Sequence, residues 1–339
     1  MSPSSPWPPL APWLQAQQTQ LLRQRGHAWL LYGPAGLGQL DLGLALVRAW
    51  LCEQPDAQGQ ACGVCASCHA LAVHAHADVC VLMPEVQMLA LGWPLPEKAQ
   101  SEIDDKKRKP SKEIRVDALR DAVEFCQRTS ARGRGKAVLV YPAEQMNTIA
   151  ANALLKTLEE PVGDVRFVLA TEAAHMLLPT IRSRCLGHAM QWPQPAQAQQ
   201  WLQAQGIGAD DAAQALRMAG GSPWQALQMA QQPQWLAWSR QLPRWLAQGD
   251  VAALGAGATP AQLVVALHKL CHDLMCLSQG APPRYFSAQD LPPPPALRVL
   301  IRWSKTLAHE LRNAEHPWNA GLMLEALVVQ ARSVLNSKA

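Results

Sequence analysis

The sequence has few charged residues and no dense cluster of basic ones. Aspartate, glutamate, lysine and arginine make up 17% of the 339 residues, whereas apolar residues make up 49%. This balance excludes a disordered chain and predicts a globular protein of two or three domains. The net charge of +4 permits contact with nucleic acid. Strong DNA-binding proteins, however, usually carry a denser basic footprint.

An export signal and a membrane-spanning stretch are also missing. The first residues, MSPSSPWPPLAPWL, do not combine a basic region with a long apolar one, as a secretory signal does. The apolar run LGLALVRAWLC contains Arg48 and is too short to cross a bilayer. We therefore expect a cytoplasmic protein without a membrane partner, in which the nine cysteines stay reduced and some of them bind a metal.

A lysine is missing from a loop that otherwise has the form of a phosphate-binding P-loop. Residues 33–40 read GPAGLGQL, between the strand-like run HAWLLY and the helix-like run LDLGLALVRAWLC, which is the setting of a P-loop. In the pattern G-x4-G-K-[ST], the lysine contacts the outer phosphates and the hydroxyl binds magnesium. Gln39 and Leu40 occupy these two positions here.

The acidic pair of an ATPase is missing as well. It would follow the strand-like run AVLVY, where this chain has Pro142 and Ala143, with Glu144 one position late. Because two independent parts of the catalytic machinery are lost, we predict a subunit that binds and hydrolyses no ATP. The vestigial loop, with Gly33, Gly36, Gly38 and Gln39, then serves as a structural turn.

Four cysteines stand at metal-ligand spacing. They are Cys52, Cys62, Cys65 and Cys68, in the pattern C-x9-C-x2-C-x2-C. Four thiolates this close suit a structural, tetrahedral zinc site, which we predict for a module at 52–68. Ordinary buried cysteines are one alternative. An iron–sulfur cluster is another, although its bacterial motif needs a further cysteine where Ala72 stands, and His69 could replace one ligand.

Strand-like and helix-like runs alternate through the first half of the chain. DVCVL, AVLVY and RFVLA read as short strands, separated by the helices VDALRDAVEFCQR and TIAANALLKTLEE, which predicts a parallel sheet covered on both faces. The charged stretch at 97–115 has almost no apolar anchor, so we predict a solvated, mobile surface insertion. Contact of its KKRK run with DNA phosphates is the less favoured alternative. After about residue 190 only helices are predicted.

Two arginines follow the run RFVLATE in the segment PTIRSRC, at 179–185. Surface arginines usually serve solubility alone, but an arginine can also act in trans on the γ-phosphoryl group of a neighbour's nucleotide. Arg184 in that role would explain a protein whose own site is inactive. Nearby, Glu159 and Glu160 lie against the dipole of their helix. A network or partner-facing role and an ordinary unfavourable surface pair both stay open for them.

Together these segments resemble the clamp-loader branch of the AAA+ proteins. The resemblance rests on NALLKTLEEP, PTIRSRC and HAWLLYGPAGLG, with support from GGSPWQALQ and HPWNAGLMLEALVVQ, and it covers most of the chain. It implies a RecA-like α/β AAA+ domain with a parallel sheet at 1–191, a small helical lid domain at 192–235 and an all-α collar domain at 236–339. The charged insertion at 97–115 departs from this pattern, as does Trp224, where the lid motif has an arginine.

The resemblance also implies partners. The chain is similar to a stator-like, non-hydrolysing subunit of the bacterial DNA polymerase III clamp loader, a hetero-pentamer with gamma/tau ATPase subunits and a delta subunit. Arg184 would be its trans arginine finger. The complex loads the sliding clamp on primed DNA during replication, within a holoenzyme whose DNA-directed DNA polymerase activity is a nucleotidyltransferase reaction. Two alternatives remain: an independent atypical P-loop ATPase and a zinc-containing nucleic-acid-binding regulator.

Overall fold

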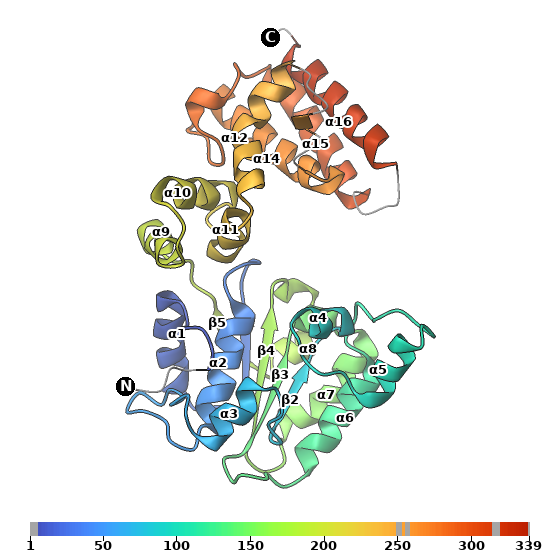
Figure 1. The fold of residues 1–339 in the computed structure, drawn as a ribbon. Helices are drawn as coiled ribbons and strands as arrows, with labels where there is room; N and C mark the ends of the chain where they lie inside the picture. Colours follow the sequence, from blue (N-terminus) through green and yellow to red (C-terminus); the bar gives the residue numbers. More distant parts are fainter. Residues whose placement is uncertain (1–5, 249–252, 255–257, 314–318, 338–339) are drawn as a thin grey trace. The chain divides into compact units, whose positions relative to one another are not determined.

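The computed structural model describes residues 6–248, 253–254, 258–313 and 319–337 (Figure 1). The chain forms two compact units, one at residues 1–193 and one at residues 194–339, and each is described by itself. Two parts of the sequence analysis, the first five residues of the N-terminus and the HPW of the last-helix motif, lie outside the described residues. No helix among the described residues is both long and apolar enough to cross a membrane.

The first unit is built on a parallel sheet of five strands in the order β2-β3-β4-β1-β5. The strands are β1 (Ala28–Tyr32), β2 (Val79–Leu82), β3 (Lys136–Val140), β4 (Val165–Thr171) and β5 (Leu186–Ala189). The predicted strands HAWLLY, DVCVL, AVLVY and RFVLA are therefore confirmed. Strand β5 was not predicted, because it is a four-residue edge strand in which only His188 is buried and which therefore forms no apolar run.

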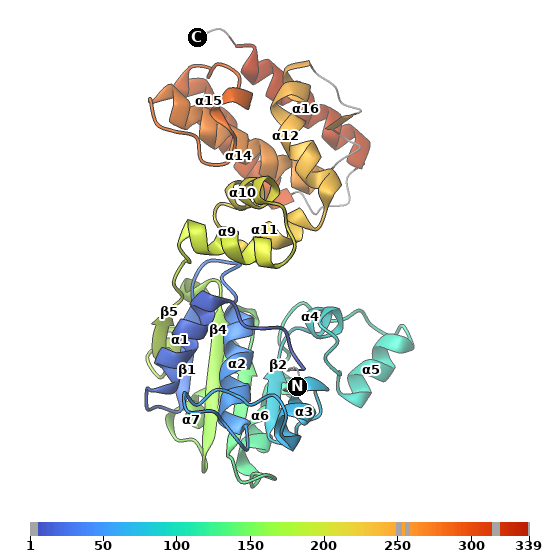
Figure 2. The same ribbon diagram turned by 60° about the vertical axis from the view of Figure 1, so that its left-hand side comes forward.

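Helices cover both faces of this sheet, as a parallel sheet requires. They are α1 (Pro12–Leu22), α2 (Gln39–Leu51), α3 (Ala66–Ala72), α4 (Glu85–Ala90), α5 (Glu97–Asp104), α6 (Val116–Gln127), α7 (Thr148–Glu159) and α8 (Pro179–Arg182). Figures 1 and 2 show α1 and α2 on one face and α6 and α7 on the other. The predicted parallel-sheet α/β fold is confirmed.

Alternate strand residues point to opposite faces of the sheet and build the two halves of the core. On one face Val138, Phe167 and Leu169 pack with Leu119 of α6 and Leu154 of α7. On the other face, a Cβ atom at position 43 would lie 2.8 Å from Leu139 Cδ1. The glycine at this position therefore lets α2 pack closely on the sheet.

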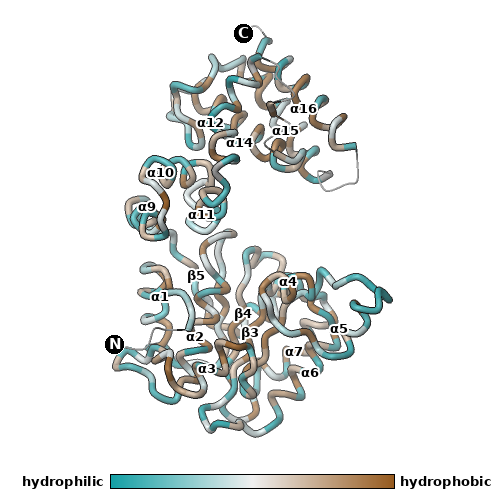
Figure 3. Tube along the Cα trace, viewed as in Figure 1, coloured by the Kyte–Doolittle hydropathy of each residue, from teal (hydrophilic) through white to brown (hydrophobic). Residues whose placement is uncertain are grey.

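The charged stretch at 97–115 is anchored to the first unit, contrary to the sequence-based expectation. Its first half forms α5, and Ile114 is completely buried in the core and forms a β-bridge with Met146. Arg108 contacts the buried Glu85 with two nitrogens, at 2.5 and 2.8 Å, and Glu102 at 2.7 Å. The turn beyond α5 is solvated, as predicted: its residues are hydrophilic (Figure 3), and its three lysines are exposed. Sequence alone undervalued Ile114 because a single apolar residue among charges shows no periodicity.

Replacing Ile114 with alanine should lower the free energy of unfolding by roughly 2–5 kcal/mol, because the substitution leaves a cavity in a closely packed core. Chemical denaturation of the full chain measures this change. Lys112→Ala is the matched control: the side chain is exposed two positions away, and its loss should change stability by no more than about 0.5 kcal/mol. Equal midpoints for the two variants would contradict the anchoring role of Ile114.

Among its described residues, the second unit contains helices joined by loops and no strand, as predicted. Helices α9 (Pro195–Ala204), α10 (Ala209–Met218) and α11 (Pro223–Ala230) share one core, centred on Leu202, Ala215 and Ala226. A larger core lies between α12 (Pro233–Gln248), α14 (Pro260–Ser278), α15 (Leu297–Asn313) and α16 (Ala320–Leu335). Trp238 and Trp303 are buried in it, which fits the packing role expected of tryptophans in these helices.

Candidate functional site

The four predicted metal ligands lie together at the end of α2 and the start of α3. Their sulfur atoms are all within 4.8 Å of one another. The Cys52–Cys65 and Cys52–Cys68 sulfur distances are both 3.8 Å, and the Cys62–Cys68 distance is 3.9 Å. Four thiolates at 2.3 Å from one metal ion form a tetrahedron with edges of about 3.8 Å. The cluster could therefore hold a single metal ion.

Local backbone geometry supports this donor set. Amide groups donate to the sulfurs: Cys62 N to Cys52 Sγ at 3.3 Å, Cys65 N to Cys62 Sγ at 3.4 Å, and Cys68 N to Cys65 Sγ at 3.4 Å. Burial raises the pKa of the Cys65 thiol, but the amide of Cys68 and further hydrogen bonds outweigh it and lower this pKa to about 7. Such bonds favour the thiolate, which is the form that binds a metal. Burial instead raises the pKa values of the Cys52 and Cys68 thiols, so the lowered pKa belongs to Cys65 and is not shared by these two. His69 is exposed and lies outside the group.

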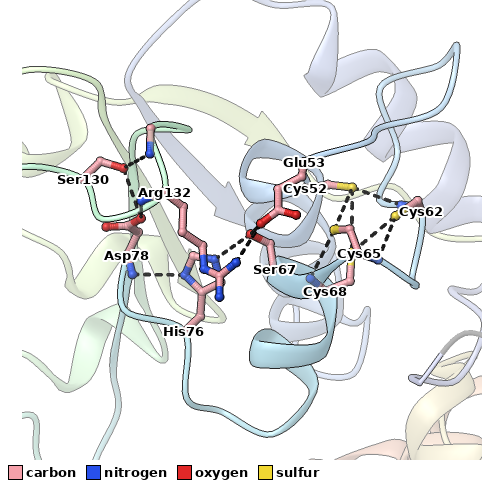
Figure 4. Close-up of polar contacts among 11 residues, drawn as sticks. Cys52, Glu53, Cys62, Cys65, Ser67, Cys68, His76, Asp78, Ser130 and Arg132 are labelled. Carbon is pink, nitrogen blue, oxygen red and sulfur yellow. Dashed lines mark hydrogen bonds and ion pairs between the residues drawn. The ribbon is translucent and has the colours of Figure 1, made fainter.

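A chain of polar groups lies beside the cysteine cluster (Figure 4), in which Ser67, His76 and Asp78 are buried while Glu53 and Arg132 are exposed. The Ser67 hydroxyl, next to Cys68, donates to Glu53 at 3.0 Å. His76 Nε2 lies 3.1 Å from the Ser67 oxygen, and His76 Nδ1 accepts the amide proton of Asp78 at 3.0 Å. Burial lowers the pKa of His76, which favours the neutral ring, and a neutral ring whose Nδ1 accepts a hydrogen bond carries its proton on Nε2. In that form His76 donates to the Ser67 oxygen, and Ser67 in turn donates to Glu53.

Asp78 connects the same hydrogen-bond network to the loop between α6 and β3. Its carboxylate is 1% exposed and accepts hydrogen bonds from Ser130 Oγ (3.1 Å), the Ala131 amide (2.7 Å) and the Arg132 amide (2.9 Å). The Arg132 guanidinium donates a hydrogen bond to the Glu53 carboxylate at 2.8 Å (Figure 4). None of these residues was predicted from the sequence as part of the site. Only Glu53 and Ser67 had a signal, since each is adjacent to a predicted ligand.

The glycine loop at 33–40 makes hydrogen bonds within itself. Gly36 and Gly38 have φ values of 81° and 88°, which favour glycine. The Gln39 side chain is 2% exposed, and its amide nitrogen donates to the carbonyl oxygens of Gly33 at 3.0 Å and Pro34 at 2.7 Å. Leu37 is completely buried beneath the loop. The neutral amide of Gln39 thus stabilises the turn, at the sequence position where a P-loop has its lysine.

Glu144, the displaced acidic residue, is engaged at the carboxyl end of the sheet. It accepts a hydrogen bond from Thr171 Oγ1 at 2.6 Å and another from the Glu172 amide at 3.2 Å. Tyr141 donates to the Glu172 carboxylate at 3.0 Å. Burial raises the pKa of the Glu172 carboxyl group, although the hydrogen bond from Tyr141 opposes this shift. The arrangement offers no free acidic pair at this position of the described chain.

Arg184 lies just after α8 and bonds within its own unit. Its Nε donates to Glu159 Oε1 at 2.6 Å, its Nη2 contacts the same oxygen, and its Nη1 donates to the Thr180 carbonyl at 2.7 Å. Arg182, two positions away, is exposed. From the sequence, the role of Glu159 was open between a network or partner-facing role and an ordinary surface pair, and the structure gives this residue a cationic partner.

Comparison with known proteins identifies the class. The family described as "DNA polymerase III, delta subunit" matches residues 13–193, more than half of the chain. Together with the parallel-sheet unit, this match places the chain among the subunits of DNA polymerase III. The chain belongs to the delta' family of these subunits.

Its relatives include two proteins named DNA polymerase III subunit delta'. One, from Pseudomonas aeruginosa, is 42% identical over 218 residues, which are 62% of this chain but only 58% of that protein. The other, from Escherichia coli, is 34% identical over 273 residues, 78% of this chain and 75% of that protein. A DNA polymerase III subunit gamma/tau of Mycobacterium tuberculosis is 31% identical over 212 residues, 61% of this chain and 32% of that protein. Among solved structures, a gamma subunit-related protein of Thermotoga maritima aligns over 95% of this chain and 99% of its own, with 17% identity and a TM-score of 0.48.

Proposed function

We propose that the chain is a stator-like, non-hydrolysing subunit of a clamp loader. In this role it presents Arg184 to the nucleotide of a neighbouring ATPase subunit while the complex loads a sliding clamp on primed DNA. The observation that carries the proposal is Gln39: a neutral, buried amide bonds to two loop carbonyls where a phosphate-binding loop needs a lysine. Membership of the delta' family supports the proposal that the chain works within a clamp loader.

Arg184 is chemically suited to act on a neighbour. A guanidinium has five N–H donors, and the contacts to Glu159 and Thr180 use three of them. Two N–H groups therefore remain for phosphate oxygens, and the side chain is 28% exposed. A guanidinium that is already fixed in position by hydrogen bonds on one side is well suited to stabilise charge on a transferring phosphoryl group.

The proposed domain organisation follows the same family pattern. We assign residues 1–191 to a RecA-like AAA+ domain, 192–235 to a helical lid and 236–339 to a collar that holds the hetero-pentamer together. The boundary of the two compact units after residue 193 and the two separate cores of the helical unit support this division. The proposed partners are gamma/tau ATPase subunits, a delta subunit and, through the complex, the clamp and primed DNA in the cytoplasm.

Zinc is the metal we assign to Cys52, Cys62, Cys65 and Cys68. Soft thiolates select zinc among the common divalent ions, and four protein ligands leave no open position, so the ion would have a structural role. An iron–sulfur cluster is disfavoured because its iron atoms are distributed over several positions, whereas these sulfurs surround a space suited to one ion.

The purified chain should show no ATP turnover, and neither should Gln39→Lys, because lysine alone restores no ligands for magnesium. The same wild-type chain should raise ATP turnover when added to a complex of gamma/tau and delta subunits that lacks it. Both rates are measured by phosphate release. A Gln39→Ala chain, which loses the two amide bonds to the loop, controls for changes in loop structure. Turnover by the isolated wild-type chain that persists through further purification would contradict the proposal.

A further inference from the structure

Glu159 is placed where local helix energetics disfavour an acid. It is the last residue of α7, and the carbonyl groups at the C-terminal end of a helix give this end a partial negative charge. Glu160 follows directly and adds a second negative charge. Neither residue is therefore explained by the stability of α7 alone, and what distinguishes them is their contacts.

Only one of the two glutamates holds a cation within the described residues. Glu159 Oε1 accepts from Nε of Arg184 at 2.6 Å and contacts Nη2 of the same side chain. Glu160 is exposed and has no ion pair in the described chain. The adjacent pair therefore provides a residue that contacts Arg184 and a matched one that does not.

The guanidinium of Arg184 is held from two elements at once. Glu159, from α7, binds the Nε side of the fork, and the Thr180 carbonyl, from α8, binds Nη1 at 2.7 Å. Two anchors in different directions fix the plane of the fork and not only its distance from the backbone. A free arginine side chain, in contrast, samples many rotamers and must be ordered each time it binds a phosphate.

We propose that Glu159 is a positioning residue for Arg184: it holds the guanidinium so that the two remaining N–H groups face the nucleotide of the neighbouring subunit. This inference rests on the proposed trans role of Arg184. Glu159 itself would touch neither nucleotide nor metal. Its effect would be on the rate of the chemical step, because the neighbour's own loop binds the nucleotide while the arginine acts on charge that develops during transfer.

A carboxylate so close to the arginine could also act in the opposite sense, by competing with phosphate for it. The two roles predict opposite signs. A positioning carboxylate raises kcat, so its loss lowers turnover. A competing carboxylate lowers kcat, so its loss raises turnover. Hence measurement of the sign in a reconstituted complex decides between them.

The experiment uses complete complexes reconstituted with wild-type, Glu159→Gln, Glu160→Gln, Arg184→Ala or the double variant Glu159→Gln/Arg184→Ala. ATP turnover is measured as a function of ATP concentration, after size-exclusion chromatography has established assembly. Glu159→Gln should lower kcat by up to about tenfold with an unchanged KM for ATP, since misplacement of about 1 Å can cost up to roughly 100-fold at the step affected. Glu160→Gln should match the wild type, and Glu159→Asp should recover part of the loss.

The double variant tests whether Glu159 acts through Arg184. If it does, Glu159→Gln adds no further loss once Arg184 is alanine. Four outcomes would overturn the inference: equal rates for Glu159→Gln and Glu160→Gln, a raised kcat, additive losses in the double variant, or failure of the Glu159→Gln chain to assemble. The Arg184→Ala complex distinguishes failure of the inference about Glu159 from failure of the proposed trans role of Arg184, because wild-type turnover by that complex would reject the trans role itself.

Discussion

Arg184→Ala should produce a folded chain that still joins the clamp-loader complex but fails to support full ATP turnover and clamp loading. Arginine fingers contribute roughly 10³–10⁵ to the rate at the site they serve. Because such a complex has several ATP sites, the loss in total turnover should be smaller than this factor. The partly exposed ion pair with Glu159 contributes no more than about 1 kcal/mol to stability, so the fold should persist.

Two further substitutions sharpen this expectation. Arg184→Lys should be nearly as poor as alanine, because an ammonium group cannot contact Glu159, the Thr180 carbonyl and phosphate oxygens in one plane. Arg182→Ala is the control, since this exposed arginine lies two positions away and has no ion pair among the described residues. Wild-type rates for an assembled Arg184→Ala complex would make Arg184 an ordinary surface residue.

Cys52→Ser should remove the bound metal and loosen the module at 52–68. Cys52 is completely buried, and its sulfur contacts those of Cys65 and Cys68, so its loss removes one corner of the tetrahedron. Zinc content, measured by elemental analysis, should fall from about one ion per chain to nearly none. Amide exchange should become faster at 52–68 while the sheet stays protected, because ligands released from the metal lose the free energy that orders the module.

Cys276→Ser is the matched control for this experiment. Cys276 is half-buried in the helical unit, away from the cysteine cluster in the sequence and outside it in the structure, so zinc content should not change. A wild-type chain without zinc would contradict the assignment of the metal. A brown chain with iron and sulfide would point instead to the iron–sulfur alternative.

The parts of the fold that could be predicted are those in which one local signal dominates. HAWLLY and RFVLA form buried central strands because continuous apolar runs suit a sheet covered on both faces. Strand β5 escaped prediction because an edge strand needs little apolar character. The burial of Ile114 was not predicted because the core that surrounds it is built from several strands and helices, which no short window of sequence contains.

The candidate site divides in the same way. Spacing was sufficient for the cysteines, since ligands no more than 16 positions apart can be read directly from the chain. The contact between Glu159 and Arg184 spans 25 positions, and that between Asp78 and Arg132 spans 54. Such pairs depend on how helices and strands are packed. The role of Gln39 was predicted as an absence of charge, whereas its two bonds to loop carbonyls required coordinates.

The polar chain from Glu53 to Arg132 also has a consequence for how this unit opens. Arg132 and Glu53 are 79 positions apart, yet the guanidinium closes a ring that also contains Ser67, His76 and Asp78. Ser67, His76 and Asp78 are buried, so breaking a hydrogen bond among them exposes polar groups that were satisfied inside the protein, whereas the exposed ion pair of Arg132 and Glu53 contributes little. We therefore expect the segment at 52–78 and the loop at 130–132 to open together as one unit of local unfolding, although β2, α4, α5 and α6 lie between them in the sequence.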